Sequence, residues 1–258
     1  MVRVCVIGCG NMGGALVRGL VATRSCDVTV CDVDPAALNT VSSLDVQTST
    51  DPAIVTEADV VFLAVKPDLV SPVLEDLELT AEQTLVSIAA GVPTAVLDAQ
   101  TDAMVVRMMP NLAARWGEMA AAVTGAELPA DVREILEEVG VVVDLDEAHM
   151  DTATAVNGSG PAFVFYLIQA MTQAGIDRGL APEDARLLAA QTFKGAAETV
   201  LHSDEPIEDL IDAVCSPKGT TIEGMGVLRD SDIHQTIIDA VIAAEHRAIE
   251  LAAEAQDG

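Results

Sequence analysis

Aromatic residues are scarce in this chain of 258 residues, which has four phenylalanines, one tyrosine and one tryptophan. Because half of the residues are hydrophobic and only 2% are aromatic, the core must consist of alanine, valine, leucine and isoleucine. A chain of this length forms one large domain or two small ones, with a sizeable core.

Long apolar runs are also missing. The segment Val60–Val65 is bounded by Asp59 and Lys66, and it falls well short of the roughly 18 residues of a membrane span. The first residues do not have the pattern of a secretory leader, in which an apolar run follows a charged segment, because the first apolar run leads directly into a glycine motif. The sequence therefore predicts a cytoplasmic protein.

Cysteine and histidine are not arranged to bind a metal. The cysteines form no C-x-x-C pair, and four of the five lie in or beside expected strands, so we expect buried free thiols. The four histidines are scattered and form no H-E-x-x-H motif. No metal site is expected. The cysteines are Cys5, Cys9, Cys26, Cys31 and Cys215.

Basic residues are few: 13 face 41 acidic residues, for a net charge of −28, and the only lysines are Lys66, Lys194 and Lys218. Nucleic acid and anionic membranes would be repelled by such a chain. The acids are dispersed, which is typical of a folded surface and not of a disordered tail. We interpret the charge as an adaptation to concentrated salt, where at about 1 M the Debye length falls to roughly 3 Å.

The most informative feature that is present is a glycine motif after the first expected strand. The apolar segment 2–7 ends in Gly8-Cys9-Gly10-Asn11-Met12-Gly13, and a helical pattern follows. This is the order strand, G-x-G-x-x-G, helix that a dinucleotide site needs. Gly8 permits the tight turn, Gly10 allows the pyrophosphate to approach, and Gly13 lets the helix pack on the strand. The alternative is a plain strand-to-helix turn.

The first half of the chain alternates between strand and helix signals, which favours a doubly wound parallel sheet. Strands are expected at 2–7, 28–32, 46–48, 60–65, 85–88, 104–108, 119–124 and 141–145. Helices are expected near 35–44, 69–77, 94–99 and from 129 onward.

The second half is helical throughout. Helices are expected near 161–179, 182–203, 206–214, 221–229 and 231–255, and no strand pattern occurs among them. The sequence thus predicts an α/β fold, with a Rossmann-type dinucleotide-binding domain over residues 1–150 and an all-α dimerisation and substrate domain over residues 151–258. The apolar helices favour burial in a homodimer interface.

Several candidate ligand residues fall at the ends of strands, on the side where an open α/β sheet binds its ligand. Asp32 ends the second strand, where an acid bonds the ribose hydroxyls and repels a 2′-phosphate, so it favours NADH over NADPH. The alternative is that Asp32 is one more surface acid of an acidic chain. Lys66 faces the cofactor phosphates or is simply a solvated charge. Ala89 and Ala90 leave room for a flat ring. The sixth strand ends in Arg107-Met108-Met109-Pro110-Asn111.

Near the carboxyl end, the segment from Cys215 to Glu223 predicts a well-formed helix start. Thr220 and Glu223 have capping-box spacing, which predicts Thr220 as the cap of a helix that begins at Thr221. Free N–H groups and two hydroxyls at a helix start can hold a carboxylate. The alternative is a capped helix without a ligand.

Taken together, these motifs resemble the pyrroline-5-carboxylate reductases over nearly the whole chain. The motifs that carry the resemblance are Ile7 to Gly13, Ala64-Val65-Lys66-Pro67, Ser87 to Gly91, Met109-Pro110-Asn111, Gly158 to Ala162, Gln191-Thr192, and Ser216-Pro217 with Gly219 to Ile222.

The resemblance implies reduction of 1-pyrroline-5-carboxylate to L-proline by NADH or NADPH, in a dimer or a pentamer of dimers. The active site would lie between the cofactor domain of one chain and helices shared across the dimer. The implied cofactor contacts are Ile7, Gly8, Cys9, Gly10, Asn11, Met12, Asp32, Asp51, Ala64, Val65, Lys66, Pro67, Ala89 and Ala90. The implied substrate contacts are Glu147, Ser216, Gly219, Thr220 and Thr221. Thr221 is the implied catalytic residue, which orients the imine nitrogen or relays a proton to it.

Three positions depart from the pattern of that family. Lys218-Gly219 replaces Gly-Gly, Ala213 replaces a polar residue, and Leu112-Ala113 replaces Thr-Pro. A residue other than glycine is strained at position 218 if the turn there needs a positive φ. Lys218 would otherwise place a cation beside the substrate carboxylate. Two other functions remain open: a β-hydroxyacid dehydrogenase with Lys194 as its catalytic lysine, or a cofactor-sensing protein without catalysis.

Overall fold

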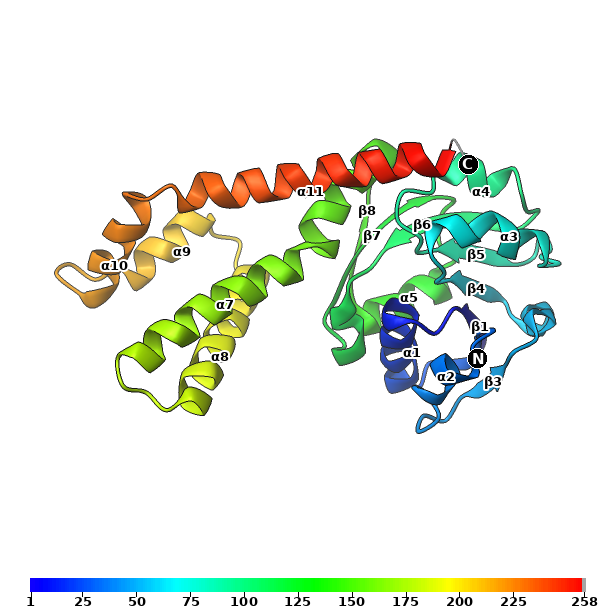
Figure 1. The fold of residues 1–258 in the computed structure, drawn as a ribbon, viewed down its shortest axis with the longest axis horizontal. Helices are drawn as coiled ribbons and strands as arrows, with labels where there is room; N and C mark the ends of the chain where they lie inside the picture. Colours follow the sequence, from blue (N-terminus) through cyan, green and yellow to red (C-terminus); the bar gives the residue numbers. More distant parts are fainter. Residues whose placement is uncertain (257–258) are drawn as a thin grey trace. The chain divides into compact units, whose positions relative to one another are not determined.

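The computed structural model describes residues 1–256, which fall into two compact units (Figure 1). Unit 1 comprises Met1–Ser159 together with the chain from Ile242 on, and unit 2 comprises Gly160–Val241. The last helix, α11 (Ile233–Gln256), belongs to both units, since its first residues lie in unit 2 and its remainder in unit 1. The division into a dinucleotide-binding domain over residues 1–150 and a dimerisation domain over residues 151–258 remains a prediction.

Unit 1 is built on one eight-stranded sheet with the order β3-β2-β1-β4-β5-β6-β7-β8. From β3 to β6 every neighbouring pair is parallel, which confirms the expected Rossmann-type sheet. The strands are β1 (Val2–Ile7), β2 (Cys26–Cys31), β3 (Gln47–Ser49), β4 (Val60–Leu63), β5 (Thr84–Ser87), β6 (Met104–Met109), β7 (Met119–Gly125) and β8 (Gly140–Asp144).

The sheet is mixed at its far edge, where one strand departs from the expected parallel arrangement. Strand β7 runs antiparallel to β6, and β8 then pairs parallel with β7. Between β6 and β7 the chain makes only the short 3₁₀ helix η3 (Leu112–Trp116). A parallel pairing needs a crossover of about a dozen residues or more, which residues 110–118 cannot provide.

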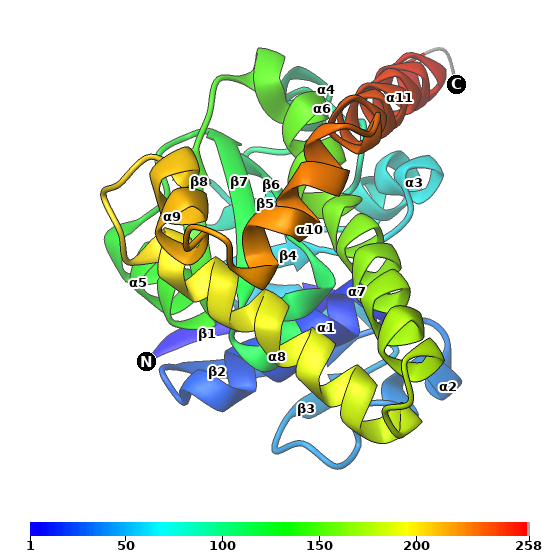
Figure 2. The same cartoon turned by 90° about the vertical axis from the view of Figure 1, so that its left-hand side faces the viewer.

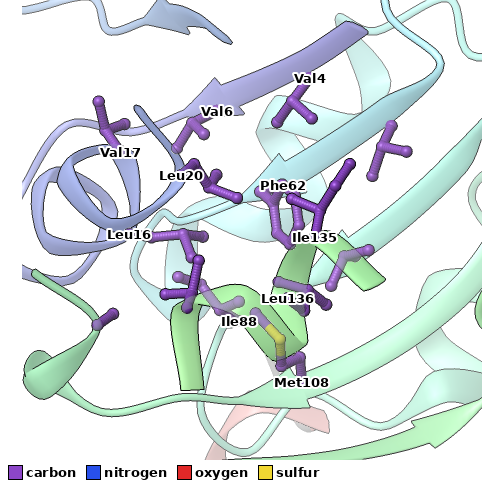
Figure 3. Packing of buried hydrophobic residues seen from close by; sticks show 14 of the residues in the cluster. Val4, Val6, Leu16, Val17, Leu20, Phe62, Ile88, Met108, Ile135 and Leu136 are labelled. Carbon is purple, nitrogen blue, oxygen red and sulfur yellow. The ribbon is translucent and has the colours of Figure 1, made fainter. Parts of the chain in front are cut away.

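Apolar side chains cover both faces of the sheet. On one face Leu16 of α1 and Leu136 of α5 pack with Phe62 of β4, as Figure 3 shows. On the other face Leu63 and Leu85 pack in a second cluster. The helices of unit 1 are α1 (Asn11–Thr23), α2 (Pro35–Asn39), α3 (Val70–Glu75), α4 (Thr94–Asp98), α5 (Ala130–Val139) and α6 (Met150–Ala153).

The four cysteines of unit 1 lie in these clusters as free thiols, as predicted. Burial is the main influence on them, and it raises the pKa of Cys5 to about 12 and that of Cys26 to about 11. Thiols with such pKa values stay protonated near neutral pH and are poor nucleophiles. Cys215, in unit 2, is also free and is half-buried.

Unit 2 consists of helices, as predicted. They are α7 (Gly160–Asp177), α8 (Pro182–Leu201), α9 (Ile207–Val214), α10 (Thr220–Arg229) and the start of α11. Helices α7 and α8 lie side by side as a hairpin (Figure 2), and Gly179 has a positive φ of 97° in its turn. Between Gly160 and Val241, all of which the structure describes, only Ala185 and Ala189 are buried.

The start of α10 differs from the prediction. The helix begins at Thr220, its N-cap is Gly219, and no side chain forms a cap hydrogen bond, so the expected capping box is wrong. The N–H of Gly219 donates to the carbonyl of Ser216 at 2.9 Å. After this turn Gly219 has an extended backbone and is the N-cap, so the helix begins one residue earlier than the capping box predicted.

The structure describes no helix that is long and apolar enough to cross a membrane. Within the described residues 1–256, no group of three or more histidine, cysteine or acidic side chains is arranged to hold a metal ion.

Candidate active site

The glycine loop after β1 has the backbone geometry that its motif requires. Gly8 has a positive φ of 95°, and a Cβ there would lie 2.5 Å from the carbonyl oxygen of Ala64. A Cβ at Gly13 would lie 2.0 Å from the carbonyl oxygen of Gly8. Both positions therefore need glycine, one for the turn and the other for the close packing of α1 on the strand.

Gly10 differs from these two glycines because the space around it is open. It has a φ of −71°, which any residue adopts, and a Cβ there would meet no atom within 4 Å. Gly10 also precedes the first helical residue, Asn11, so the free N–H groups of the first turn of α1 face this space. The loop fits a pyrophosphate group, because no side chain covers the backbone at Gly10 and the N-terminus of α1 carries a partial positive charge there.

Asp32 holds the glycine loop against the end of β2. One carboxylate oxygen accepts a hydrogen bond from the N–H of Cys9 at 2.6 Å, and the other accepts from the N–H of Asp34 at 2.9 Å. Each oxygen retains a second lone pair. The carboxylate therefore shapes the loop and can still accept hydrogen bonds from ribose hydroxyls.

Two arginines, which the sequence analysis did not single out, line a cleft of about 540 Å³ beside the loop. Arg18 of α1 donates to the backbone carbonyls of Gly14 and Thr40, and Arg115 comes from η3. Cys9, Gly10 and other loop and α2 residues complete the cleft. In a chain with so few basic residues, this places positive charge next to the expected phosphate site.

The other predicted cofactor residues gather at the carboxyl edge of the same sheet. Because β1 to β6 are parallel neighbours, the segments that follow them lie along one edge. Asp51 follows β3 and caps η1 (Pro52–Glu57) by accepting from the N–H of Ala53 at 3.0 Å. The segments Ala64–Pro67 and Ala89–Ala90 follow β4 and β5. Their binding role stays a prediction.

Glu147, predicted as a substrate contact, takes part in a cluster within unit 1. Its Oε1 accepts from the N–H of Thr94 at 3.1 Å and from Nη1 of Arg107 at 3.0 Å, and its Oε2 accepts from the Thr94 hydroxyl. Nη2 of Arg107 also donates to Asp151 at 3.3 Å. Burial, the largest influence, raises the pKa of Glu147, but the hydrogen bonds from Thr94 and Arg107 outweigh it and leave the pKa below its usual value.

The remaining predicted substrate residues form one turn in unit 2. Ser216, Gly219, Thr220 and Thr221 surround the start of α10. Lys218 lies between them with a φ of 61°, so this position does need a left-handed backbone and carries a side chain there nonetheless. Such strain in a residue other than glycine is uncommon and is often found at functional sites.

Sequence reasoning found the glycine loop and the turn before α10 but missed the partners of Arg107. A charged residue inside the otherwise apolar strand β6 is the available signal, since a buried arginine requires carboxylate partners. Its partners lie 40 and 44 positions further along the chain, and no local pattern connects them to it.

The glycine loop at the carboxyl edge of a parallel sheet, followed by a helical unit, defines a nicotinamide-dinucleotide oxidoreductase of the Rossmann type. The comparisons with known proteins agree with this class. Residues 3–91 match the family described as "NADP oxidoreductase coenzyme F420-dependent", and residues 147–251 match the family described as "Pyrroline-5-carboxylate reductase dimerisation".

The relatives cover nearly the whole chain. A pyrroline-5-carboxylate reductase of Methanosarcina acetivorans is 39% identical over 96% of this chain and 97% of its own length. One from Pseudomonas aeruginosa is 38% identical over 97% of both chains. A Coxiella burnetii structure of such a reductase is 31% identical, with a TM-score of 0.85 over 96% of this chain and 97% of its own. The chain belongs to the pyrroline-5-carboxylate reductase family.

A further structure shows a cofactor in a similar protein. The Plasmodium falciparum pyrroline carboxylate reductase, solved with NADP bound, is 27% identical, with a TM-score of 0.83 over 97% of this chain and 98% of its own.

Proposed function

We propose that this chain catalyses the reduction of 1-pyrroline-5-carboxylate to L-proline by NADH or NADPH. The observation that carries the proposal is similarity to named reductases along almost the entire chain, with family models that cover both the glycine loop and the turn before α10. The test is oxidation of the reduced cofactor that depends on the added cyclic imine.

The cofactor would be held by the carboxyl edge of the sheet in unit 1. The residues proposed for this role are Ile7 to Met12, Asp32, Asp51, Ala64 to Pro67, and Ala89 with Ala90. When bound, the reduced nicotinamide supplies a hydride. The open backbone at Gly10 and the guanidinium groups of Arg18 and Arg115 support binding of the phosphates.

The substrate would be held by Glu147 and by the turn before α10. Backbone N–H groups of Ser216 to Thr221 and the first turn of α10 are suited to a carboxylate. The imine carbon accepts a hydride, and the imine nitrogen must carry a proton in the product. A threonine hydroxyl is a poor acid, so Thr221 orients the nitrogen of a substrate that binds already protonated. The chain mainly contributes proximity and a carboxylate anchor.

The preference of the chain is proposed to be for NADH. The carboxylate of Asp32 at the end of β2 can accept from both ribose hydroxyls and repels a 2′-phosphate. We expect kcat/KM to be higher with NADH than with NADPH when both are measured in the same buffer. Comparable values for the two cofactors would contradict a discriminating role of Asp32.

Lys218 is proposed to add a cation beside the substrate carboxylate. Its left-handed φ of 61° destabilises the folded chain by roughly 1–2 kcal/mol, and glycine would avoid this strain. Glycine is also more flexible in the unfolded chain, which offsets about 0.5–1 kcal/mol of that stabilisation. Lys218→Gly should therefore raise KM for the imine severalfold without lowering the melting temperature. Steady-state kinetics measure KM, and thermal melts measure the melting temperature. An unchanged KM would dismiss the carboxylate role.

The chain is proposed to act as a homodimer, or as a pentamer of dimers, with residues 151–258 as its dimerisation and substrate domain and residues 1–150 as its dinucleotide-binding domain. The match to a dimerisation family and the exposed apolar residues of unit 2 support self-association. Phe165, Tyr166 and Leu187 are 66%, 72% and 68% exposed, as expected for residues that a partner covers. A mass measurement in solution tests the oligomer size.

We further propose that the protein works in the cytoplasm at a high salt concentration. Its charge of −28 produces repulsion that concentrated salt screens. Helical structure or assembly should be lost when the salt falls from molar to millimolar concentration. Circular dichroism and the elution volume follow the two properties. Identical spectra and elution volumes in both buffers would contradict the adaptation.

A further inference from the structure

Arg107 is a buried cation that none of the roles above uses. Its side chain is only 4% exposed, yet it lies in the strand β6 between Ser87 of β5 and Thr124 of β7. Two carboxylates neutralise it, those of Glu147 and Asp151. Its Nε is buried without a hydrogen-bond partner among the described residues. Burial of a charged group with an unpartnered N–H is costly, so we expect this guanidinium to have a structural or functional role that offsets the cost.

The partners of Arg107 connect it to the turn after β5. Glu147 bonds Arg107 with one oxygen and bonds both the N–H and the hydroxyl of Thr94. Thr94 is the first residue of α4, and the turn Ala89–Pro93 directly precedes it. At the other end of this turn, Ser87 pairs with Arg107 across the sheet. The guanidinium of Arg107 is therefore linked through Glu147 to the Thr94 end of the turn, while the strand that leads into the turn pairs with the backbone of Arg107.

One side of the turn packs closely against α11. Gly91 has a positive φ of 76°, and a Cβ there would lie 3.0 Å from the Cα of Ala252 in α11. Ala89 is 2% exposed and packs in the apolar cluster beneath the sheet edge. A change in the contacts of Thr94 would thus be transmitted to Ala89 and Ala90, because the opposite side of the turn is fixed by α11.

We infer that Arg107 is a positioning residue for hydride transfer, which acts through Glu147 and Thr94 to fix the turn Ala89–Pro93. The inference rests on the proposed function, in which Ala89 and Ala90 form the wall for the nicotinamide ring. A reacting geometry that shifts by about 1 Å costs roughly a hundredfold in rate. Arg107 touches neither substrate nor cofactor in this account, so its loss lowers kcat and leaves cofactor affinity nearly intact.

The same cluster predicts a change in the pH profile. The charged and polar groups around Glu147 are Arg107 from β6, Asp151 from α6, Thr94 from α4, and Asp146 and His149 on its own segment. Arg107 is the cation that bonds it. Loss of Arg107 removes a hydrogen bond and a positive charge that lower the pKa of Glu147, so Glu147 takes up a proton at a higher pH than in the wild type. The acid limb of kcat should therefore move to higher pH.

The experiment compares Arg107→Met and Arg107→Lys in the full-length protein in molar salt. We measure cofactor affinity, kcat and KM across pH, and amide hydrogen exchange in peptides that cover residues 88–96 and 144–151. Arg107→Met should lower kcat by about 10- to 100-fold, move the acid limb upward and speed exchange in both peptides. Arg107→Lys keeps the charge but lacks the forked guanidinium whose two Nη atoms bond the two carboxylates, so its values should fall between those of the wild type and Arg107→Met.

Arg3→Met is the matched control. Arg3 also pairs with a carboxylate through its guanidinium, that of Asp59, but the pair is exposed and lies at the start of β1, away from the carboxyl edge. This variant should keep the wild-type kcat, acid limb and exchange in the two peptides.

The outcomes separate this inference from the proposed function. Wild-type protein without imine-dependent turnover contradicts the proposed function, and hydrogen exchange then still tests whether Arg107 fixes the turn. A folded Arg107→Met variant with wild-type exchange in residues 88–96, or with wild-type kcat and acid limb, overturns the positioning role. A loss of cofactor affinity as large as the loss of kcat would overturn it as well.

Discussion

Gly10→Ala should weaken cofactor binding while leaving the fold unchanged. The φ of −71° suits alanine, and the new methyl group would meet no protein atom within 4 Å, so the free energy of unfolding should change by no more than about 0.5 kcal/mol. The methyl would instead occupy the space into which the pyrophosphate must come. We expect the dissociation constant for NADH to rise at least about tenfold, which is roughly 1.4 kcal/mol.

Gly13→Ala is the contrasting variant. Its Cβ would lie 2.0 Å from the carbonyl oxygen of Gly8, so the loop itself must deform. This variant should lose both thermal stability and cofactor affinity, whereas Gly10→Ala should lose only affinity. Cofactor titrations and thermal melts of the two proteins measure the difference. Wild-type affinity in Gly10→Ala would show that the phosphates do not pass over this loop.

Thr221→Ala should lower kcat/KM by about a hundredfold while the affinity for NADH stays within a factor of about two. Thr221 lies in the first turn of α10, in unit 2, and the cofactor residues lie in unit 1, so its removal takes no group from the glycine loop. The expected loss has one cause: the hydroxyl no longer orients the imine nitrogen relative to the hydride donor. Steady-state kinetics with a separate cofactor titration measure the two effects.

Thr221→Ser is the matched control, since it keeps the hydroxyl and removes only a methyl group. Its kcat/KM should stay near that of the wild type. Unchanged kinetics in Thr221→Ala would remove Thr221 from the mechanism. A loss in Thr221→Ser as large as that in Thr221→Ala would assign the effect to packing of the methyl group.

The sequence predicted the secondary structure well because its signals are local and repeat regularly. The apolar runs in strands such as Val60–Leu63 and the helical spacing after Gly160 both report burial directly. The antiparallel β7 was missed, although the short connection before it excludes a crossover. The cap of α10 was placed one residue late because the turn from Ser216 to Gly219, and not a threonine side chain, sets where the helix begins.

The candidate site was predicted where a motif is contiguous and missed where it is not. The strain at Lys218 could be anticipated because the family motif has glycine there, and its φ is indeed positive. The cluster of Arg107, Glu147 and Thr94 joins three distant segments, and only the folded sheet brings them together. The dehydrogenase and cofactor-sensing alternatives lost support when the comparisons assigned the chain to the reductase family.

The central claim is tested most directly by mixing the full-length chain, in molar salt, with NADH or NADPH and then adding 1-pyrroline-5-carboxylate. Loss of nicotinamide absorbance and formation of L-proline are followed together. We predict that the absorbance falls only after the imine is added, and that one L-proline forms for each cofactor oxidised. A folded protein that binds the cofactor but oxidises neither NADH nor NADPH with this imine would contradict the account.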